Sequence, residues 1–117
     1  MNQTEKQIEN QILFWLRAQG IYSWKNQSVG IFDAKKQVFR KSKNPWHING
    51  VADILGVIEG RFLSIEVKSK KGVQSDSQKT FAENVGNNGG IYILARSVED
   101  VQSALSSEGY VFRTRFL

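Results

Sequence analysis

Three charged residues stand inside two apolar runs in the middle of the chain. Asp53 lies near the start of the run 51–58, and Glu66 and Lys68 lie at the end of the run 61–68. Residues two apart in a strand point to the same face, so Glu66 and Lys68 are expected on one polar face. Two carboxylates that converge in a sheet repel one another unless a cation lies between them. These residue types suit a hard divalent cation, Mg²⁺ or Mn²⁺, which prefers oxygen ligands.

A hairpin would bring the two carboxylates together. Glu59 and Gly60 separate the two runs and predict a tight antiparallel turn. Asp53 would then lie beside Glu66, and the backbone carbonyl group of Val67 would be well placed as a further oxygen ligand. A simpler interpretation is that these charges form only the solvated side of an amphipathic strand.

The same stretch resembles a nuclease family. "GVADIL" and "LSIEVKSKKGVQSDSQ" are similar to the motifs of the virus-type replication-repair nuclease domain, VRR-NUC, of the PD-(D/E)XK superfamily. The resemblance extends to "QIENQILFWLRAQG" and "GGIYILARSVEDV", and so covers most of the chain. Ala52 stands where the family often has proline, which is a backbone feature and not a ligand. The resemblance implies an α/β fold with a single mixed β-sheet flanked by helices, in the αβββαβ order of the PD-(D/E)XK core.

The resemblance also implies roles for individual residues. Asp53 and Glu66 match the metal-binding carboxylates of the family. Lys68 matches the lysine that orients or activates the attacking water or stabilises the charged phosphate. Gln78 matches a glutamine on the helix after this lysine, and Glu9 matches a first-helix glutamate that reaches the metal directly or through water.

Gln78 and Glu9 also have purely structural interpretations. Ser75 and Gln78 have the spacing of a capping box at a helix start. Glu9 lies at the border of the apolar stripe of its predicted helix, where a solvated glutamate is ordinary. Both interpretations of each residue stay open at the level of sequence.

The implied activity is metal-dependent hydrolysis of phosphodiester bonds in DNA. Small stand-alone members of the family look like Holliday-junction resolvases, which act as homodimers. A four-way junction is cut at two symmetric points, and two active centres related by a two-fold axis are the simplest way to make both cuts. We therefore expect a Mg²⁺- or Mn²⁺-dependent structure-specific endonuclease that acts on four-way junctions as a homodimer. The alternatives are a nicking or flap-type nuclease on other branched DNA, and a nucleic-acid-binding module without catalysis.

Composition sets further limits. The 117 residues suit one domain, 1–117, and the formal net charge of +5 would attract a polyanion. The chain has no cysteine, which excludes disulfides, thiolate metal sites and cysteine nucleophiles. No apolar run reaches the ~20 residues of a membrane span, so we expect a cytoplasmic protein of a bacterium or a phage-infected cell, with no membrane partner. The basic residues expected to hold DNA phosphates are Lys35, Lys36, Arg40, Lys41, Lys43, Lys70 and Lys71.

Hydrophobic periodicity predicts one mixed sheet with helices on both faces. The predicted elements are helices over 4–20, 75–86 and 97–109, strands over 21–27, 51–58, 61–68, 91–95 and 110–116, and a loop or irregular hairpin around 37–40. The wholly apolar run 91–95 is expected to be a central strand. Trp24 lies inside a strand pattern and is expected in the core, although Trp24, Trp46 and Tyr22 also lie near the basic stretch, where aromatic faces can stack on unpaired bases.

Overall fold

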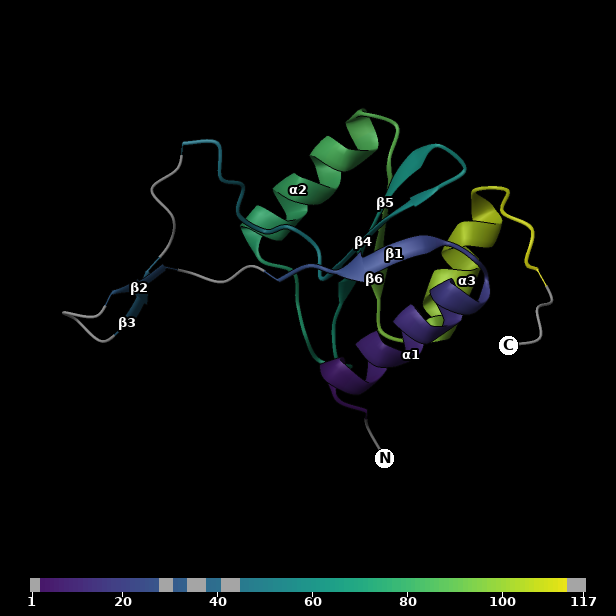
Figure 1. Ribbon diagram of the computed structural model, residues 1–117, viewed down its shortest axis with the longest axis horizontal. Helices are drawn as coiled ribbons and strands as arrows, with labels where there is room; N and C mark the ends of the chain where they lie inside the picture. The colour runs from purple at the N-terminus through teal and green to yellow at the C-terminus, as the bar shows by residue number, and fades with distance from the viewer. Residues whose placement is uncertain (1–2, 28–30, 34–37, 41–44, 114–117) are drawn as a thin grey trace.

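The structure, a computed structural model, describes residues 3–27, 31–33, 38–40 and 45–113. It shows an α/β fold with a four-stranded sheet, three helices and a separate two-stranded hairpin (Figure 1). No helix in these ranges is both long and apolar enough to cross a bilayer. The elements are α1 (Glu5–Ala18), β1 (Tyr22–Lys25), β2 (Ile31–Asp33), β3 (Val38–Arg40), β4 (Ile54–Ile58), β5 (Arg61–Val67), α2 (Asp76–Asn87), β6 (Ile91–Ala95) and α3 (Val98–Ser107).

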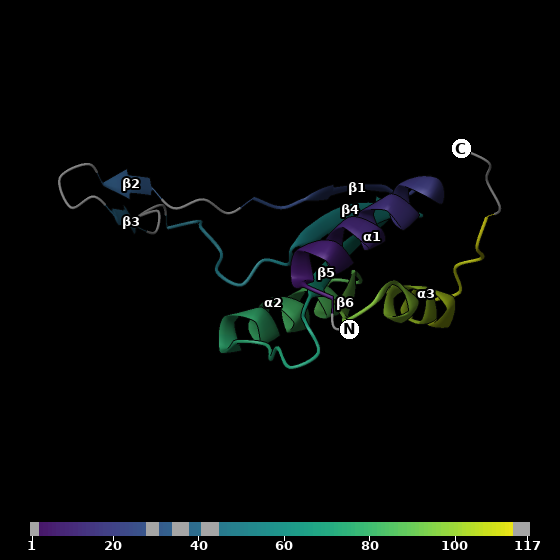
Figure 2. The same ribbon diagram turned by 90° about the horizontal axis from the view of Figure 1, so that it is seen from below.

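The four-stranded sheet is mixed, as predicted. Its strand order is β1-β4-β5-β6, in which β1, β4 and β5 are antiparallel neighbours and β6 runs parallel to β5. Of the two alternatives around 37–40, a loop or an irregular hairpin, the structure shows the hairpin, because β2 and β3 pair antiparallel. Figure 2 shows this hairpin at one end of the molecule, apart from the sheet.

The turn between β4 and β5 fixes the register of these strands. Glu59 and Gly60 have φ values of 48° and 79°, and two consecutive positive values are typical of a type I′ turn. This turn matches the twist of the strands that it joins. The register places Ile54 opposite Ile65, and it therefore determines which residues meet at the open end of the hairpin.

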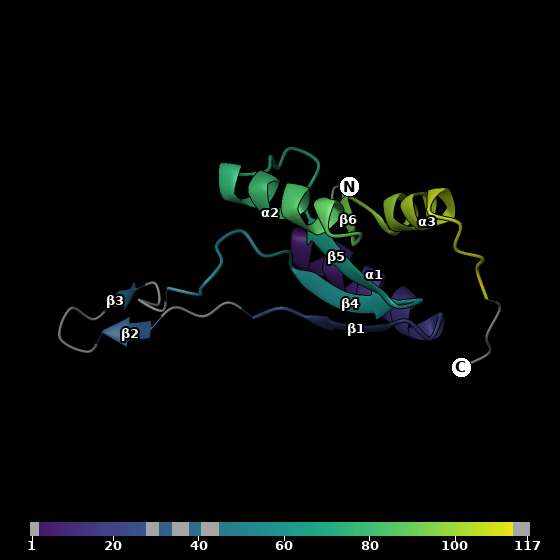
Figure 3. The ribbon, with the colours of Figure 1, turned by 90° about the horizontal axis from the view of Figure 1, so that it is seen from above.

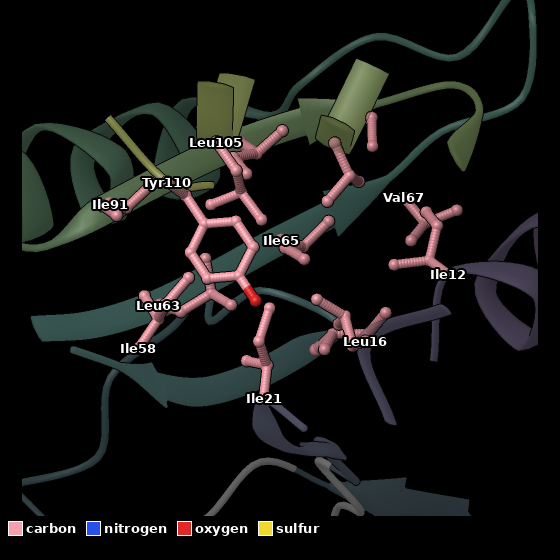
Figure 4. Packing of buried hydrophobic residues seen from close by; sticks show 14 of the residues in the cluster. Ile12, Leu16, Ile21, Ile58, Leu63, Ile65, Val67, Ile91, Leu105 and Tyr110 are labelled. Carbon is pink, nitrogen blue, oxygen red and sulfur yellow. The ribbon is translucent and has the colours of Figure 1, made fainter. Parts of the chain in front are cut away.

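One face of the sheet packs against α1 and α3. Thr4 and Gln7 form a capping box at the start of α1, and the helix then buries Ile8, Ile12 and Leu16 at helical spacing. Figure 4 shows Ile12 and Leu16 meeting the inward side chains of the strands. The core cluster comprises Ile8, Ile12, Leu16, Ile21, Ile54, Ile58, Leu63, Ile65, Val67, Ile91, Ile93, Ala95, Val101, Leu105 and Tyr110.

The other face is covered only in part, by α2. The helix lies beside β5 and β6, while β1 lies at the far edge of the sheet (Figure 3). Phe81 of α2 meets Tyr92 of β6 edge to face, with ring centroids 6.1 Å apart. On the open part, Trp24 is 42% exposed. The prediction that Trp24 belongs to the core is therefore wrong, because the helix that would bury it lies over the opposite edge.

β6 is an edge strand and not the central strand predicted from its apolar sequence. Ile91, Ile93 and Ala95 face the core, and Tyr92 faces α2. Helices thus cover both faces of this strand, which gives an edge strand the wholly apolar pattern typical of a central one.

The predicted last strand is absent from residues 110–113, and its remainder lies outside the described residues. The backbone of this segment forms hydrogen bonds with the side chain of Gln19 and not with a neighbouring strand. Gln19 donates to the Arg113 carbonyl at 2.9 Å and accepts from the Arg113 N–H at 2.8 Å. Tyr110 is buried in the core, and Phe112 packs edge to face on Trp15. The alternating aromatic residues therefore anchor the segment through its side chains.

Candidate metal centre

Asp53 and Glu66 meet at the open end of the β4–β5 hairpin. Asp53 directly precedes β4, and the register continues from Ile54 and Ile65 to place it opposite Glu66. The Asp53 Oδ2 atom accepts a hydrogen bond from the backbone N–H of Val67 at 2.8 Å, which holds the carboxylate against β5. Glu66 is buried, with 3% of its surface exposed. The hairpin thus brings together the two carboxylates that the sequence pattern paired.

The two oxygen atoms of Glu66 have different surroundings. Oε1 accepts a hydrogen bond from Gln78 Nε2 at 3.1 Å and lies 4.0 Å from Lys68 Nζ. Oε2 is buried, and no donor contacts it among the described residues. A buried carboxylate oxygen without a donor is costly, so a proton, a cation or an ordered water molecule must satisfy this atom.

Burial and Asp53 together hold a proton on Glu66. The pKa of Glu66 is raised from 4.5 to about 8, first because burial disfavours its charge. The protonated carboxyl group can also share a hydrogen bond with Asp53, and it avoids repulsion by the Asp53 charge. Lys68 acts in the opposite direction and is outweighed. A divalent cation between the carboxylates would replace this proton.

The donors at this place fit Mg²⁺ or Mn²⁺. The backbone N–H of Lys68 donates a hydrogen bond to the Ala95 carbonyl at 3.0 Å, so the backbone polar groups of Lys68 point toward β6. Those of the preceding residue, Val67, point the opposite way, toward Asp53. The Val67 carbonyl group therefore points to the edge where the two carboxylates meet. Two carboxylates, a carbonyl group and water are typical ligands of these ions. No group of three or more histidine, cysteine, aspartate or glutamate residues in the described part of the chain is placed to hold a metal.

Gln78 reaches the centre because α2 begins beside it. Gly50 packs against the first turn of this helix with φ +78°, and a Cβ atom there would lie 2.4 Å from the backbone of Ser77. Only glycine fits this approach and this dihedral angle. The close approach positions the start of α2 over the hairpin, so that Gln78 contacts Glu66.

Glu9 and Glu5 lie one turn apart on α1 and have different partners. Glu9 is buried and forms an ion pair with Lys25 of β1, with 3.4 Å between Nζ and Oε1. Its predicted contact with the metal stays a prediction. Glu5, which sequence reasoning missed, accepts a hydrogen bond from the Ser69 N–H at 3.3 Å, and its charge contributes to the raised pKa of Glu66. The spacing of four residues from Glu9 was the available signal for Glu5.

Sequence reasoning also missed Tyr92 and Arg96. Tyr92 lies on the same face as Glu66, and its hydroxyl accepts a hydrogen bond from Gln74 at 2.9 Å. Burial raises the pKa of Tyr92 and outweighs the hydrogen bond from Gln74, which lowers it; the charges of Glu66 and Asp53 add to the rise, so the hydroxyl keeps its proton. Arg96 donates to the carbonyl groups of Ser69 and Lys70, and it thereby ties down the loop after Lys68. Neither residue belongs to a pattern that is visible in one sequence.

The predicted phosphate-binding residues are placed only in part. Lys70 and Lys71 are exposed next to the centre, on the loop between β5 and α2. Arg40 lies in β3, and nothing further is described of its side chain. The residues Lys35, Lys36, Lys41 and Lys43 lie outside the described ranges.

Comparison of the chain with family models, curated proteins and solved structures gives no match. The resemblance to VRR-NUC nucleases therefore rests on the quoted motifs alone. The geometry of Asp53, Glu66, Lys68 and Gln78 is an independent observation, and it describes a buried glutamate beside a half-buried aspartate, with one cationic and one amide neighbour.

Proposed function

We propose that this protein is a Mg²⁺- or Mn²⁺-dependent endodeoxyribonuclease of the VRR-NUC type. The observation that carries the proposal is the pairing of half-buried Asp53 with buried Glu66, in which Glu66 Oε2 lacks a donor within the described residues. Carboxylates whose pKa is strongly raised, as that of Glu66 is, are more common at functional sites than elsewhere.

The order of elements supports the same proposal. Without the β2–β3 hairpin, the chain runs α1, β1, β4, β5, α2, β6, which is the αβββαβ order implied by the resemblance. Asp53 lies at the start of one hairpin strand and Glu66 near the end of the next, with Lys68 two residues further on. Fold alone does not determine function, so the proposal depends on the site and not on the topology.

Each residue of the site has a role in phosphodiester hydrolysis. A cation held by Asp53, Glu66 and the Val67 carbonyl group would lower the pKa of its bound water and neutralise charge on the phosphate. Lys68 places a positive charge beside this position and stabilises the negative charge that develops in the transition state. Gln78 holds Glu66 in the orientation that aims Oε2 at the cation. Lys70 and Lys71 would hold flanking phosphates without regard to sequence.

Cleavage of labelled DNA in Mg²⁺ and in Mn²⁺ tests the proposal. Asp53→Asn, Glu66→Gln and Lys68→Gln should each lower the rate by roughly 10²-fold or more. Glu83→Gln and Lys79→Gln are matched controls on the exposed surface of α2 and should cleave like the wild type. If the wild-type protein binds DNA but never cuts it with either ion, the nuclease proposal fails and the alternative of a nucleic-acid-binding module without catalysis remains.

The finer proposal is a homodimer that resolves four-way junctions. It rests on the candidate centre at Asp53 and Glu66: one chain would supply one such centre, and symmetric cuts at two points suit two centres related by a two-fold axis. Paired symmetric nicks on a labelled junction would support it. Single nicks confined to flaps or splayed arms would favour the other branched-DNA nuclease. A sedimentation mass of one chain, with and without DNA, would exclude the dimer.

A further inference from the structure

The open face of the sheet carries a row of apolar side chains. Tyr22 of β1 lies opposite Val57 of β4, and Val57 lies opposite Phe62 of β5. Residues directly opposite one another share a face, and the charged side chains of the metal centre belong to this same face. These three side chains are 75%, 45% and 40% exposed, in that order. The sheet thus presents apolar surface to solvent on the side where the carboxylates lie.

Trp24 extends this surface to the carboxylate pair. It lies opposite Leu55, two residues from Asp53, and the backbone N–H of Asn26 continues the ladder to the Asp53 carbonyl at 2.7 Å. Strand spacing places the Cα atoms of Trp24 and Asp53 about 8 Å apart. The rings of Tyr22 and Trp24 have centroids 5.5 Å apart and are tilted by 56°, so they are not stacked flat on one another.

We propose that Trp24 and Tyr22 stack on unpaired nucleobases of the strand whose phosphate lies at Asp53 and Glu66. The inference rests on the proposed nuclease function and narrows its substrate to DNA with unpaired nucleotides beside the cut. Aromatic side chains stack on every base, because every base has a π-face.

Two observations select a nucleic-acid strand as the occupant of this surface. The net charge of +5 and the exposed Lys70 and Lys71 near the centre complement a polyanion. The aromatic surface is also continuous with the centre, so a strand bound there by its phosphate reaches Trp24 and then Tyr22 along the same face. Paired bases are stacked within their duplex and cannot use this surface, whereas unpaired bases can.

Binding measurements on cleavage-deficient protein test the stacking directly. The Glu66→Gln protein is titrated in Mg²⁺ into a fluorescein-labelled oligothymidylate of about 12 nucleotides and into a duplex of equal length. Adding Trp24→Ala should weaken binding of the oligothymidylate roughly tenfold and leave duplex binding almost unchanged. Trp24→Phe keeps an aromatic face and should retain most of the affinity. The control is Val111→Ala, which removes a 79% exposed apolar side chain from the segment after α3 and should change neither affinity.

The possible outcomes separate this inference from the nuclease proposal. Unchanged binding by Trp24→Ala, or an equal loss for both DNAs, overturns the stacking. A parent protein that sediments as a dimer, and becomes a monomer on Trp24→Ala, identifies the face as an interface between copies and also overturns it. A selective loss on oligothymidylate, in a protein whose wild type cleaves no DNA, supports the stacking surface while the nuclease proposal fails.

Discussion

Gln78 contacts Glu66 and caps α2 with the two ends of one amide group. Its Oε1 atom accepts from the backbone N–H of Ser75 at 2.9 Å, and its Nε2 atom donates to Glu66 Oε1 at 3.1 Å. The capping box inferred from spacing and the contact with the centre inferred from resemblance are therefore made together. The start of the helix and the orientation of the buried carboxylate are linked through this side chain.

Gln78→Glu separates the two contacts. The carboxylate still accepts the capping hydrogen bond, but it cannot donate to Glu66 and instead repels it. We expect cleavage to fall by roughly 10- to 100-fold, as for other residues that orient metal ligands. Ser75→Ala is the matched control: it should cost about 1 kcal/mol of stability and leave cleavage close to the wild type. Equal cleavage by Gln78→Glu and wild type would show that the Glu66 contact has no role in catalysis.

Glu66 makes the stability of the metal-free protein depend on pH. Its pKa is raised to about 8 in the folded state, against an ordinary value of 4.5, so the folded protein retains a proton that the unfolded chain releases. The stabilisation is complete below pH 4.5 and is lost as the pH rises through about 8.

Mg²⁺ bound at the proposed site would compete with this proton. The rise in melting temperature caused by saturating Mg²⁺ should therefore increase between pH 4.5 and 8, the interval between the two pKa values. Thermal unfolding with Mg²⁺ or with EDTA measures this rise at each pH. Glu66→Gln carries no titrating proton at this position. The melting temperature of this variant should therefore depend much less on pH, and the rise caused by Mg²⁺ should no longer increase with pH. A Mg²⁺ effect of constant size across this interval would contradict a site at Glu66.

Gly50 and Gly86 provide opposite tests of backbone packing. Gly50→Ala introduces a Cβ atom 2.4 Å from the Ser77 backbone at φ +78°, and we expect a loss of about 2 to 3 kcal/mol in the free energy of unfolding. The start of α2 should shift as well, which would lower cleavage. Gly86→Ala lies within α2 with open space around it and should stabilise by up to about 1 kcal/mol. Urea denaturation measures both changes, and a neutral Gly50→Ala would contradict the packing described for α2.

Local patterns predicted the carboxylate pair, and nonlocal packing explains the errors. The alternation within 61–68 and the turn at Glu59 and Gly60 depend on neighbouring residues, so they place Asp53 beside Glu66 without further information. The exposure of Trp24 depends instead on which part of the sheet α2 covers, and the sequence around Trp24 does not determine where α2 packs. The edge position of β6 has the same cause, since helices on both faces imitate the environment of a central strand.

Side chains that satisfy distant backbone groups were equally difficult to predict. Gln19 holds the segment at Arg113 through two hydrogen bonds across 94 positions of sequence. The strand pattern at 110–116 gives no indication that a glutamine at the end of α1 makes the backbone hydrogen bonds that a neighbouring strand would otherwise make. Glu5 and Glu9 pose a related difficulty, because helical periodicity places both on one side of α1 and does not say which of them reaches the centre.

A comparison of Glu5→Gln with Glu9→Gln decides which glutamate of α1 serves the proposed metal centre. Glu5 contacts Ser69, next to Lys68, and acts electrostatically on Glu66, so Glu5→Gln should lower cleavage by roughly tenfold or more. Glu9 pairs with Lys25, whose side chain is 49% exposed, so Glu9→Gln should cost about 1 kcal/mol of stability and have a small effect on cleavage. Cleavage rates in Mg²⁺ and urea denaturation of both variants give the two values. The reverse order, with cleavage lost in Glu9→Gln and kept in Glu5→Gln, would assign the role to Glu9, as the family resemblance implies.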